Sequence, residues 1–460
     1  MKRILKSQLL GWKKNPTRKP IILQGARQVG KSYLVREVGE SFNTFVELNF
    51  DFSQKYCSIF EPDLDPERII REISLLKQTK IIPGDTLLFL DEIQECPAAV
   101  RALRYFHEMM PELHVIAAGS LLEFAVEKIG LPVGRVTPMH LYPMSLLEFA
   151  MAKNMDKILL ESAGFFPDRI PEVFHTKLLK LFGEYMVIGG MPEVVSSWIK
   201  EGDFVRCREI QNEIIEVYRT DFQKYSGKHQ VKYVDLLYSS IYTAAGRKFT
   251  YSSISDNYKS RELKPALDLL VKADLIHQIF HSSSSAVPLK AGKKMNYFKL
   301  IMSDVGLMQA MINDSVSQWV IDPAKTSEIQ GNAAEAFVGQ EIVANSSPLK
   351  KYELFYWART KKGANAEIDY LIEASGGIIP VEVKAGKSSR MVSMEIYLKE
   401  KPQIEYGIHF SPGNNRRGDK IVRLPIYLAG SITGNWFTEK SIQINNTNPF
   451  TDKRARQDSS

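Results

Sequence analysis

The chain has 460 residues, of which 44% are hydrophobic, which allows about two to four domains with buried cores. A formal net charge of +7 permits nucleic acid as a partner without requiring it. Three scattered cysteines argue against a disulfide framework and a zinc site, and they fit a reducing compartment: Cys57, Cys96 and Cys207. No apolar signal segment or membrane span is apparent, so we predict a soluble, cytoplasmic protein without a membrane partner.

The first predicted element is a buried strand at residues 20–24, followed by a glycine-rich turn and a helix. The turn fits GxxxxGKS, whose backbone N–H groups cradle nucleotide phosphates. Its residues are Gly25, Ala26, Arg27, Gln28, Val29, Gly30, Lys31 and Ser32. Lys31 is expected to reach the β- and γ-phosphates of ATP, and Ser32 to ligate Mg²⁺. The pattern therefore predicts ATP and Mg²⁺ as cofactors.

Further strands are predicted at 44–50, 86–90 and 114–118, alternating with helical segments, as in a parallel sheet covered on both faces. The second of these ends in Asp91, which is expected to hold Mg²⁺ through water, and Glu92, which is expected to orient or deprotonate the attacking water. Ser120 follows the third strand as a predicted sensor of the γ-phosphate, with an ordinary turn serine as the alternative. Residues 1–151 thus read as a P-loop NTPase core within an α/β protein.

The middle of the chain is predicted to be helical, with a lid region at 152–228 and a winged-helix-like region at 229–300. In the second region, helical segments lead into a predicted hairpin whose exit is lined by lysines. These are Lys290, Lys293, Lys294 and Lys299. Two interpretations remain open: a DNA contact, or a packing module with an ordinary solvated basic face.

Residues 301–440 are predicted to form a second, smaller α/β domain, followed by a disordered tail at 441–460. Two of its strands form an expected antiparallel pair that places Asp369 beside Glu382 and Lys384, and a helix is expected to present Glu335 to them. Carboxylates that hold Mg²⁺ or Mn²⁺ beside a lysine suit phosphodiester cleavage, and the order D…ExK is the signature of PD-(D/E)XK nucleases. Whether this site cleaves is left open.

With these motifs, the chain resembles a widespread bacterial and archaeal group of AAA-superfamily ATPases. Their C-terminal domain of unknown function ends in a nuclease-like region. The resemblance covers nearly the whole chain and includes GARQVGKS, LLFLDEIQ, GGMPEVV, AEIDYLI and PVEVKAG. It implies ATP binding and hydrolysis, and a γ-phosphate contact for Arg135, with a lone surface arginine as the alternative. Ala26 and Ser32 stand where relatives often have proline and threonine, and neither change removes a required group.

The favoured hypothesis is an AAA-superfamily ATPase that couples its nucleotide state to a C-terminal module for DNA or a protein partner. One alternative is a Mg²⁺-dependent DNA nuclease regulated by ATP. The other is an ATP-switched adaptor with an inactive nuclease fold. The biological role, the partner and the oligomeric state do not follow from the sequence. Retention of all four nuclease-site residues favours the nuclease over the adaptor.

Overall fold

A computed structural model describes the chain in two compact units. Unit 1 comprises Met1–Tyr142, Lys272–Asp274 and Ser347–Lys351, and unit 2 comprises Pro143–Val271, Leu275–Ser346 and Tyr352–Ser460. The described residues are 1–120, 122, 130, 132, 134–225, 230–244, 246–255, 257–312, 328–359, 366–374, 376–386 and 391–433. The tail predicted at 441–460 lies outside them.

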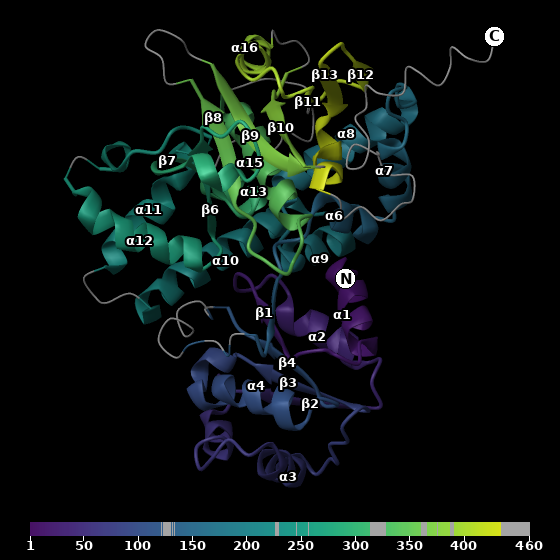
Figure 1. The fold of residues 1–460 in the computed structure, drawn as a ribbon, viewed down its shortest axis with the longest axis vertical. Helices are drawn as coiled ribbons and strands as arrows, with labels where there is room; N and C mark the ends of the chain where they lie inside the picture. The colour runs from purple at the N-terminus through teal and green to yellow at the C-terminus, as the bar shows by residue number, and fades with distance from the viewer. Residues whose placement is uncertain are drawn as a thin grey trace. The chain divides into compact units, whose positions relative to one another are not determined.

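Unit 1 is built on a five-stranded parallel sheet with the strand order β2-β3-β4-β1-β5 (Figure 1). The strands are β1 (Ile21–Gln24), β2 (Thr44–Asn49), β3 (Thr86–Asp91), β4 (His114–Ala118) and β5 (Thr137–His140). Every residue of β1, β3 and β4 is buried, as expected for parallel strands covered on both faces. The predicted parallel sheet is confirmed. Strand β5 was not predicted, because its sequence TPMH lacks a continuous apolar run.

In the described part of unit 1, four α-helices accompany this sheet. They are α1 (Leu5–Lys14), α2 (Lys31–Gly39), α3 (Pro66–Lys77) and α4 (Pro97–Met109), with short 3₁₀ turns at Gln54–Ile59 and Ile93–Glu95. Helix α3 illustrates how the sequence sets its bounds. Asp65 caps its first turn by accepting a hydrogen bond from the Glu67 N–H, and Gln78 ends it in a left-handed conformation with φ of 50°.

Unit 2 has a largely helical first half. Its helices are α6 (Leu146–Ala152), α7 (Asp156–Ala163), α8 (Glu172–Ile188), α9 (Pro192–Glu201), α10 (Phe204–Tyr225), α11 (Val231–Ala244) and α12 (Ser260–Lys272). Later helices are α13 (Val305–Ile312), α15 (Glu328–Ala344) and α16 (Val392–Glu400), with 3₁₀ segments at Tyr251–Ser253, Leu289–Gly292 and Ile426–Thr433. Among the described residues, no helix combines the length and apolar character needed to cross a bilayer.

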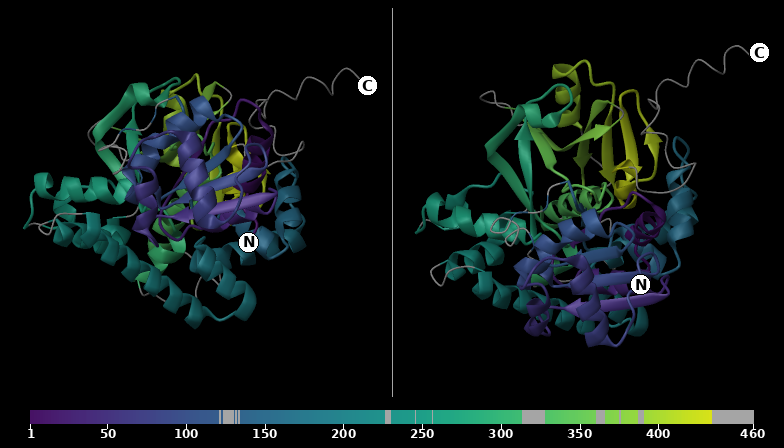
Figure 2. Two further views of the ribbon diagram at one scale, coloured as in Figure 1. Left: turned by 90° about the horizontal axis from the view of Figure 1, so that it is seen from below. Right: turned by 60° about the horizontal axis from the view of Figure 1, so that its bottom comes forward.

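The second half of unit 2 is organised by one mixed sheet with the strand order β12-β13-β11-β10-β9-β8-β6-β7. Its strands are β6 (Ile276–Ser282), β7 (Lys293–Met302), β8 (Leu354–Ala358), β9 (Glu367–Ala374), β10 (Gly377–Val383), β11 (Gly407–Ser411), β12 (Arg416–Arg417) and β13 (Ile421–Pro425). Figure 2 shows this sheet in green and yellow, and helix α15 contacts both β7 and β10.

The predicted winged-helix hairpin is part of this larger sheet. Strands β6 and β7 pair antiparallel, as a hairpin should, but β6 also pairs in parallel with β8. The predicted domain boundary at residue 300 therefore falls inside β7. A separate winged-helix domain ending there does not match this continuous sheet.

Three segments that lie far apart in the sequence meet inside unit 2, at Met144, Gly190 and Asp304. The buried carboxylate of Asp304 accepts hydrogen bonds from the backbone N–H groups of Gly190 and Leu307, at 2.6 and 2.9 Å. A Cβ atom at Gly190 would stand 2.1 Å from the carbonyl oxygen of Met144. Burial raises the pKa of Asp304 to about 6, although these hydrogen bonds act to lower it. The GGMP turn and the start of α13 are thus held by one side chain.

Candidate nucleotide site and C-terminal carboxylate cluster

The glycine-rich turn of unit 1 lies between β1 and α2 and depends on both of its glycines. Gly25 and Gly30 have positive φ values of 142° and 91°. A Cβ atom at Gly25 would stand 2.1 Å from the carbonyl oxygen of Leu141, so the turn has no room for a side chain there. Helix α2 follows the turn as predicted, but it begins directly after Gly30, so that Lys31 and Ser32 form its first residues.

The residues between the two glycines differ in their environment. Ala26 and Val29 are buried, Arg27 and Gln28 are more accessible, and Gln28 has a positive φ of 64°. A left-handed conformation is uncommon for a side chain other than glycine, asparagine or aspartate, and often marks a constrained loop. The turn is therefore a strained, partly buried loop.

Lys31 lies inside this loop. Its side chain is 7% exposed, and Nζ donates hydrogen bonds to the carbonyl oxygens of Gly25 (2.9 Å) and Ala26 (2.8 Å). Burial lowers the pKa of Lys31 to about 8, although the nearby carboxylates of Glu92 and Asp91 oppose this shift. The ammonium group is thus held where it can exchange two carbonyl oxygens for phosphate oxygens.

Ser32 and Asp91 meet as the sequence predicted. The Ser32 hydroxyl donates to the Asp91 carboxylate, with Oγ at 3.0 and 2.9 Å from its two oxygens. Asn49 donates a third hydrogen bond to Asp91 at 3.0 Å from the end of β2, where the two residues pair in register. Burial raises the pKa of Asp91, and the bond from Ser32 counteracts this. Asn49 was not predicted, although its place at a strand end beside Asp91 could have indicated it.

Glu92 follows Asp91 in a left-handed conformation with φ of 51°. Its carboxylate accepts a hydrogen bond of 2.6 Å from Nε2 of Gln94. A Cβ atom at Gly119 would stand 2.1 Å from Oε1 of the same glutamine, so Gln94 fills the space between the ends of β3 and β4. Gln94 was not predicted as a site residue. We interpret it as a positioning residue for Glu92.

Ser120 lies just beyond β4, at the same edge of the sheet as the glycine-rich turn. The last residue of β4, Ala118, pairs with Asp91 on one side and with Leu23 on the other. This edge is where open α/β sheets bind their ligands. The position of Ser120 is consistent with the predicted sensor, whose role stays a prediction.

Arg3 supports the turn from the N-terminal segment, and no sequence motif indicated this role. Its guanidinium group is buried and donates to the carbonyl oxygens of Val29 (2.7 Å) and Tyr142 (2.6 Å). One side chain thereby ties the turn to the segment that follows β5.

Arg135 does not join this site in its own chain. It precedes β5, whose first residue pairs with the first residue of β1, so it lies at the amino edge of the sheet. Its Nε donates to Glu108, near the end of α4, at 2.6 Å. The glycine-rich turn follows the opposite, carboxyl edge. The γ-phosphate contact implied by the resemblance is therefore not formed by Arg135 within the same chain.

In unit 2, two of the predicted nuclease-like residues lie on adjacent strands, Asp369 on β9 and Glu382 on β10, while Lys384 directly follows β10 and Glu335 lies on α15. Val381 pairs with Tyr370, and continuing this antiparallel register by one residue places Asp369 opposite Glu382, on one face of the sheet. Asp369 also accepts a hydrogen bond from the Val383 N–H at 2.8 Å, and Lys384 forms an ion pair of 3.1 Å with Glu382. The prediction that Asp369 and Glu382 share a face agrees with this register.

A lysine that was not predicted to belong to this cluster occupies its centre. Lys299 of β7 is 1% exposed, and its Nζ lies 3.6 Å from Glu335, 3.8 Å from Asp369 and in contact with Glu367. Burial alone would lower the pKa of Lys299, but these carboxylates raise it above its usual value. Burial raises the pKa of Glu335 to about 8, with Asp369 adding to the shift and Lys299 opposing it.

Three parts of the chain match known protein families. Residues 17–150 match a family described as AAA domain, and residues 179–318 and 330–428 match two domains of unknown function (DUF8612 and DUF4143). The first match covers the turn, Asp91 and Glu92. Unit 1 thus carries an AAA-type P-loop ATPase domain. No curated protein sequence is similar enough to this chain to count as a match.

Two solved structures are similar to this chain at low sequence identity. A Walker-type ATPase of Pyrococcus abyssi is 17% identical, with a TM-score of 0.42, over 67% of this chain and 94% of the other. The Orc1 protein of Aeropyrum pernix, solved in complex with DNA, is 14% identical, with a TM-score of 0.26, over 67% and 90%. TM-scores this low carry no argument about function.

The two carboxylate sites differ in how well they suit a divalent cation. In the carboxylate cluster of unit 2, Lys299 already stands between three carboxylates, and no group of three or more His, Cys, Asp or Glu residues in the described part of the chain is arranged to hold a metal. In the AAA domain, Ser32 and Asp91 suit Mg²⁺, which proteins often bind through one or two carboxylates plus substrate phosphates. The residues at the first site therefore do not fit a metal, and those at the second do.

Replacing Lys299 by alanine is expected to destabilise unit 2 by up to roughly 3–5 kcal/mol, because the buried Asp369 and the partly exposed Glu335 and Glu367 lose their counter-charge. Mn²⁺ at millimolar concentration should restore part of this loss in the variant and leave the unchanged protein unaffected. Thermal unfolding with and without Mn²⁺ measures both effects. Lys153→Ala, which breaks an ion pair with Glu184 elsewhere in unit 2, is the matched control. Mn²⁺ stabilisation of the unchanged protein that disappears with Asp369→Asn would contradict this interpretation.

The lysines predicted to contact DNA are partly neutralised within unit 2. Lys290 and Lys293 both form ion pairs with Glu353, the first at 3.1 Å. Lys293 also lies over the ring of Phe280, 3.6 Å from its centroid. Three of the four predicted lysines thus have a carboxylate partner, since Lys299 belongs to the carboxylate cluster, and the DNA contact at this hairpin stays a prediction.

Proposed function

We propose that the AAA domain binds and hydrolyses ATP, and that the nucleotide state controls a binding module in unit 2. The observation that carries the proposal is the convergence of Lys31, the Ser32–Asp91 pair and Glu92 at the carboxyl edge of one parallel sheet. The match of residues 17–150 to an AAA domain supports it.

Each residue has a distinct task in this proposal. Lys31 holds the β- and γ-phosphate oxygens, and Ser32 and Asp91 are the residues that would hold Mg²⁺. The ion, when bound, neutralises phosphate charge. Glu92 orients the attacking water and accepts its proton, and Gln94 keeps the Glu92 carboxylate in place through its 2.6 Å hydrogen bond.

For unit 2, the ion pairs of Lys299 favour a binding or adaptor role over Mg²⁺-dependent cleavage. A buried ammonium among Glu335, Glu367 and Asp369 supplies the positive charge that catalytic metal ions supply in nucleases. The rival hypothesis of an ATP-regulated nuclease requires that Lys299 leave this position. DNA and a protein are both retained as candidate partners of the module.

The proposed ATPase activity is tested by replacing Asp91. Asp91→Asn is expected to lower Mg²⁺-dependent phosphate release from ATP by about 100-fold, because a neutral amide holds a divalent cation poorly. Asp85→Asn is the matched control, since Asp85 is exposed and immediately precedes the opposite end of the same strand. Equal phosphate release by the unchanged protein and the Asp91 variant would refute the proposed site.

A further inference from the structure

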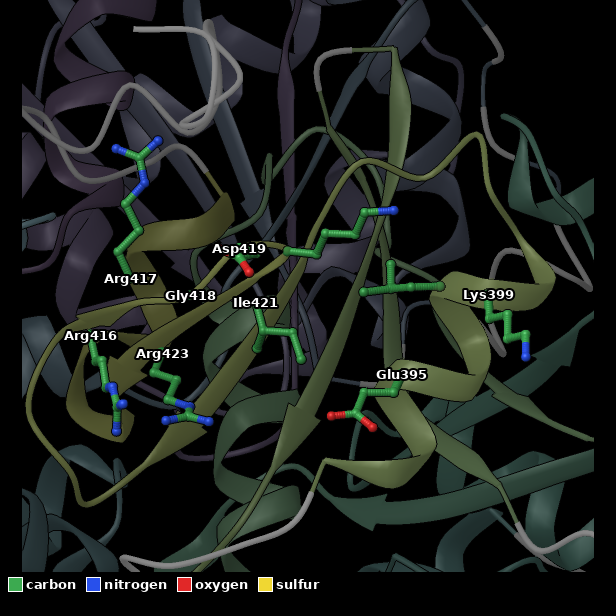
Figure 3. Close-up of a pocket in the computed structure, with 10 residues that line it drawn as sticks. Glu395, Lys399, Arg416, Arg417, Gly418, Asp419, Ile421 and Arg423 are labelled. Carbon is green, nitrogen blue, oxygen red and sulfur yellow. The ribbon is translucent and has the colours of Figure 1, made fainter. Parts of the chain in front are cut away.

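A cavity of about 520 Å³ lies at the β12–β13 edge of the unit 2 sheet, beside helix α16 (Figure 3). Five of its lining residues are basic and two are acidic, Glu395 and Asp419. The basic residues are Lys399, Arg416, Arg417, Lys420 and Arg423. Neither the AAA match nor the carboxylate cluster accounts for this concentration of positive charge.

Two of the arginines face each other across antiparallel strands. Arg416 of β12 pairs with Arg423 of β13, and like charges directly opposite one another destabilise a sheet. In Figure 3 their side chains extend in the same direction, with the Glu395 carboxylate of α16 opposite them. Among the residues that the structure describes, neither arginine forms an ion pair within 4.0 Å. The edge therefore carries a repulsion that a bound anion would relieve.

A histidine on the neighbouring strand β11 lies close to the same positive charges. His409 of β11 pairs in register with Arg423 on one side and Glu382 on the other. It is buried, and burial together with the charges of Arg423 and Lys384 lowers its pKa to about 4. At neutral pH this histidine is uncharged, so it neither adds to the repulsion nor offsets it.

The register also connects the cavity with the carboxylate cluster. Successive partners across β10, β11, β13 and β12 are Glu382, His409, Arg423 and Arg416, and extending the β9–β10 register by one residue beyond the Tyr370–Val381 pair adds Asp369 opposite Glu382. Residues paired in register point to the same face of a sheet. One face therefore changes from acidic to basic over five neighbouring strands, and its basic end opens into the cavity.

We propose that this cavity binds the phosphate group of a nucleotide, either free or as part of a nucleic-acid strand. Arginine guanidinium groups are suited to phosphate, because they donate several hydrogen bonds from a planar fork. The volume exceeds what one phosphate fills, and Leu398 and Ile421 supply apolar surface for the sugar or base. This site is separate from the P-loop and does not depend on ATP hydrolysis.

The test uses the full-length chain carrying Lys31→Ala, so that the P-loop does not compete for nucleotide. Fluorescence anisotropy with a fluorescein-labelled oligothymidylate measures binding, and inorganic phosphate and thymidine monophosphate are added as competitors. Adding Arg416→Gln and Arg423→Gln should weaken binding at least about tenfold. The same pair of changes should not lower the melting temperature of the free protein, because it removes a repulsion.

In the matched control, the Lys31→Ala chain carries Lys200→Ala and Lys264→Ala in place of the two arginine changes. These remove two exposed positive charges of unit 2 away from the cavity. Binding that survives this control and is lost in the arginine variant supports the site. Competition by thymidine monophosphate indicates a nucleotide pocket, and binding of the oligonucleotide without such competition indicates a strand site. Unchanged affinity in the arginine variant overturns the proposal. The proposal is also overturned if oligonucleotide binding is lost only in a variant in which Lys290, Lys293 and Lys294 are replaced.

Discussion

Glu92→Gln is expected to keep ATP binding intact while lowering ATP turnover by at least about 100-fold. The amide preserves the shape of the side chain, and its oxygen can still accept the hydrogen bond from Gln94. It cannot accept a proton from water, so the chemical step fails and the ATP-bound state accumulates. Phosphate release measures turnover, and a fluorescent ATP analogue measures binding.

The neighbouring Glu95→Gln provides the control, because Glu95 is exposed and loses the same charge three residues further along the chain. It should hydrolyse ATP at a rate close to that of the unchanged protein. If Glu92→Gln retains full turnover, Glu92 is not the catalytic base and another group must activate the water.

Lys31→Ala is expected to weaken ATP binding by about 100-fold or more. Lys31 is the buried ammonium within the P-loop, and two charge-assisted hydrogen bonds to phosphate are worth roughly 3 kcal/mol together. Isothermal titration with Mg²⁺ and ATP measures the loss. Lys19→Ala, which removes a partly exposed lysine just before β1, should bind ATP normally.

The same lysine predicts how ATP affinity depends on pH. Its pKa of about 8 in the free protein means that it is charged below pH 8 and increasingly neutral above it. Bound phosphate favours the charged form and raises this pKa, so binding takes up a proton above pH 8 and affinity falls by up to about tenfold per pH unit. Titrations at about pH 8.5 in two buffers of different ionisation enthalpy detect the uptake. An affinity that is constant from about pH 7 to 9 would argue against a lowered pKa.

The strands of the AAA domain were predictable because a doubly covered parallel strand is a continuous apolar run. This holds for β1, β3 and β4, which are buried throughout. Strand β5 escaped prediction because half of its residues are only partly buried and one is proline. The parallel pairing of β6 with β8 was also not predicted, because pairing between distant segments leaves no local pattern in the sequence.

Site residues were likewise predicted where a local sequence pattern placed them, and missed where only pairing between distant segments did. Asp369 and Glu382 lie on adjacent strands that are close in sequence, so the expected antiparallel pairing was enough to predict that they lie side by side. Asn49 and Lys299 reach their carboxylates from other strands, and only the register of the folded sheet brings them there. Gln94 was within reach of prediction, because it stands two residues after Glu92 in the LDEIQ segment.

The place of Lys299 on β7 limits how this protein can be divided into expression fragments. A fragment that starts after residue 300 keeps Glu335, Glu367 and Asp369 but lacks the ammonium group that lies among them. It also lacks β6, and so exposes the edge of β8 to pairing with other chains. Such a fragment is expected to aggregate, whereas one that begins before β6 carries its own counter-charge and a complete sheet.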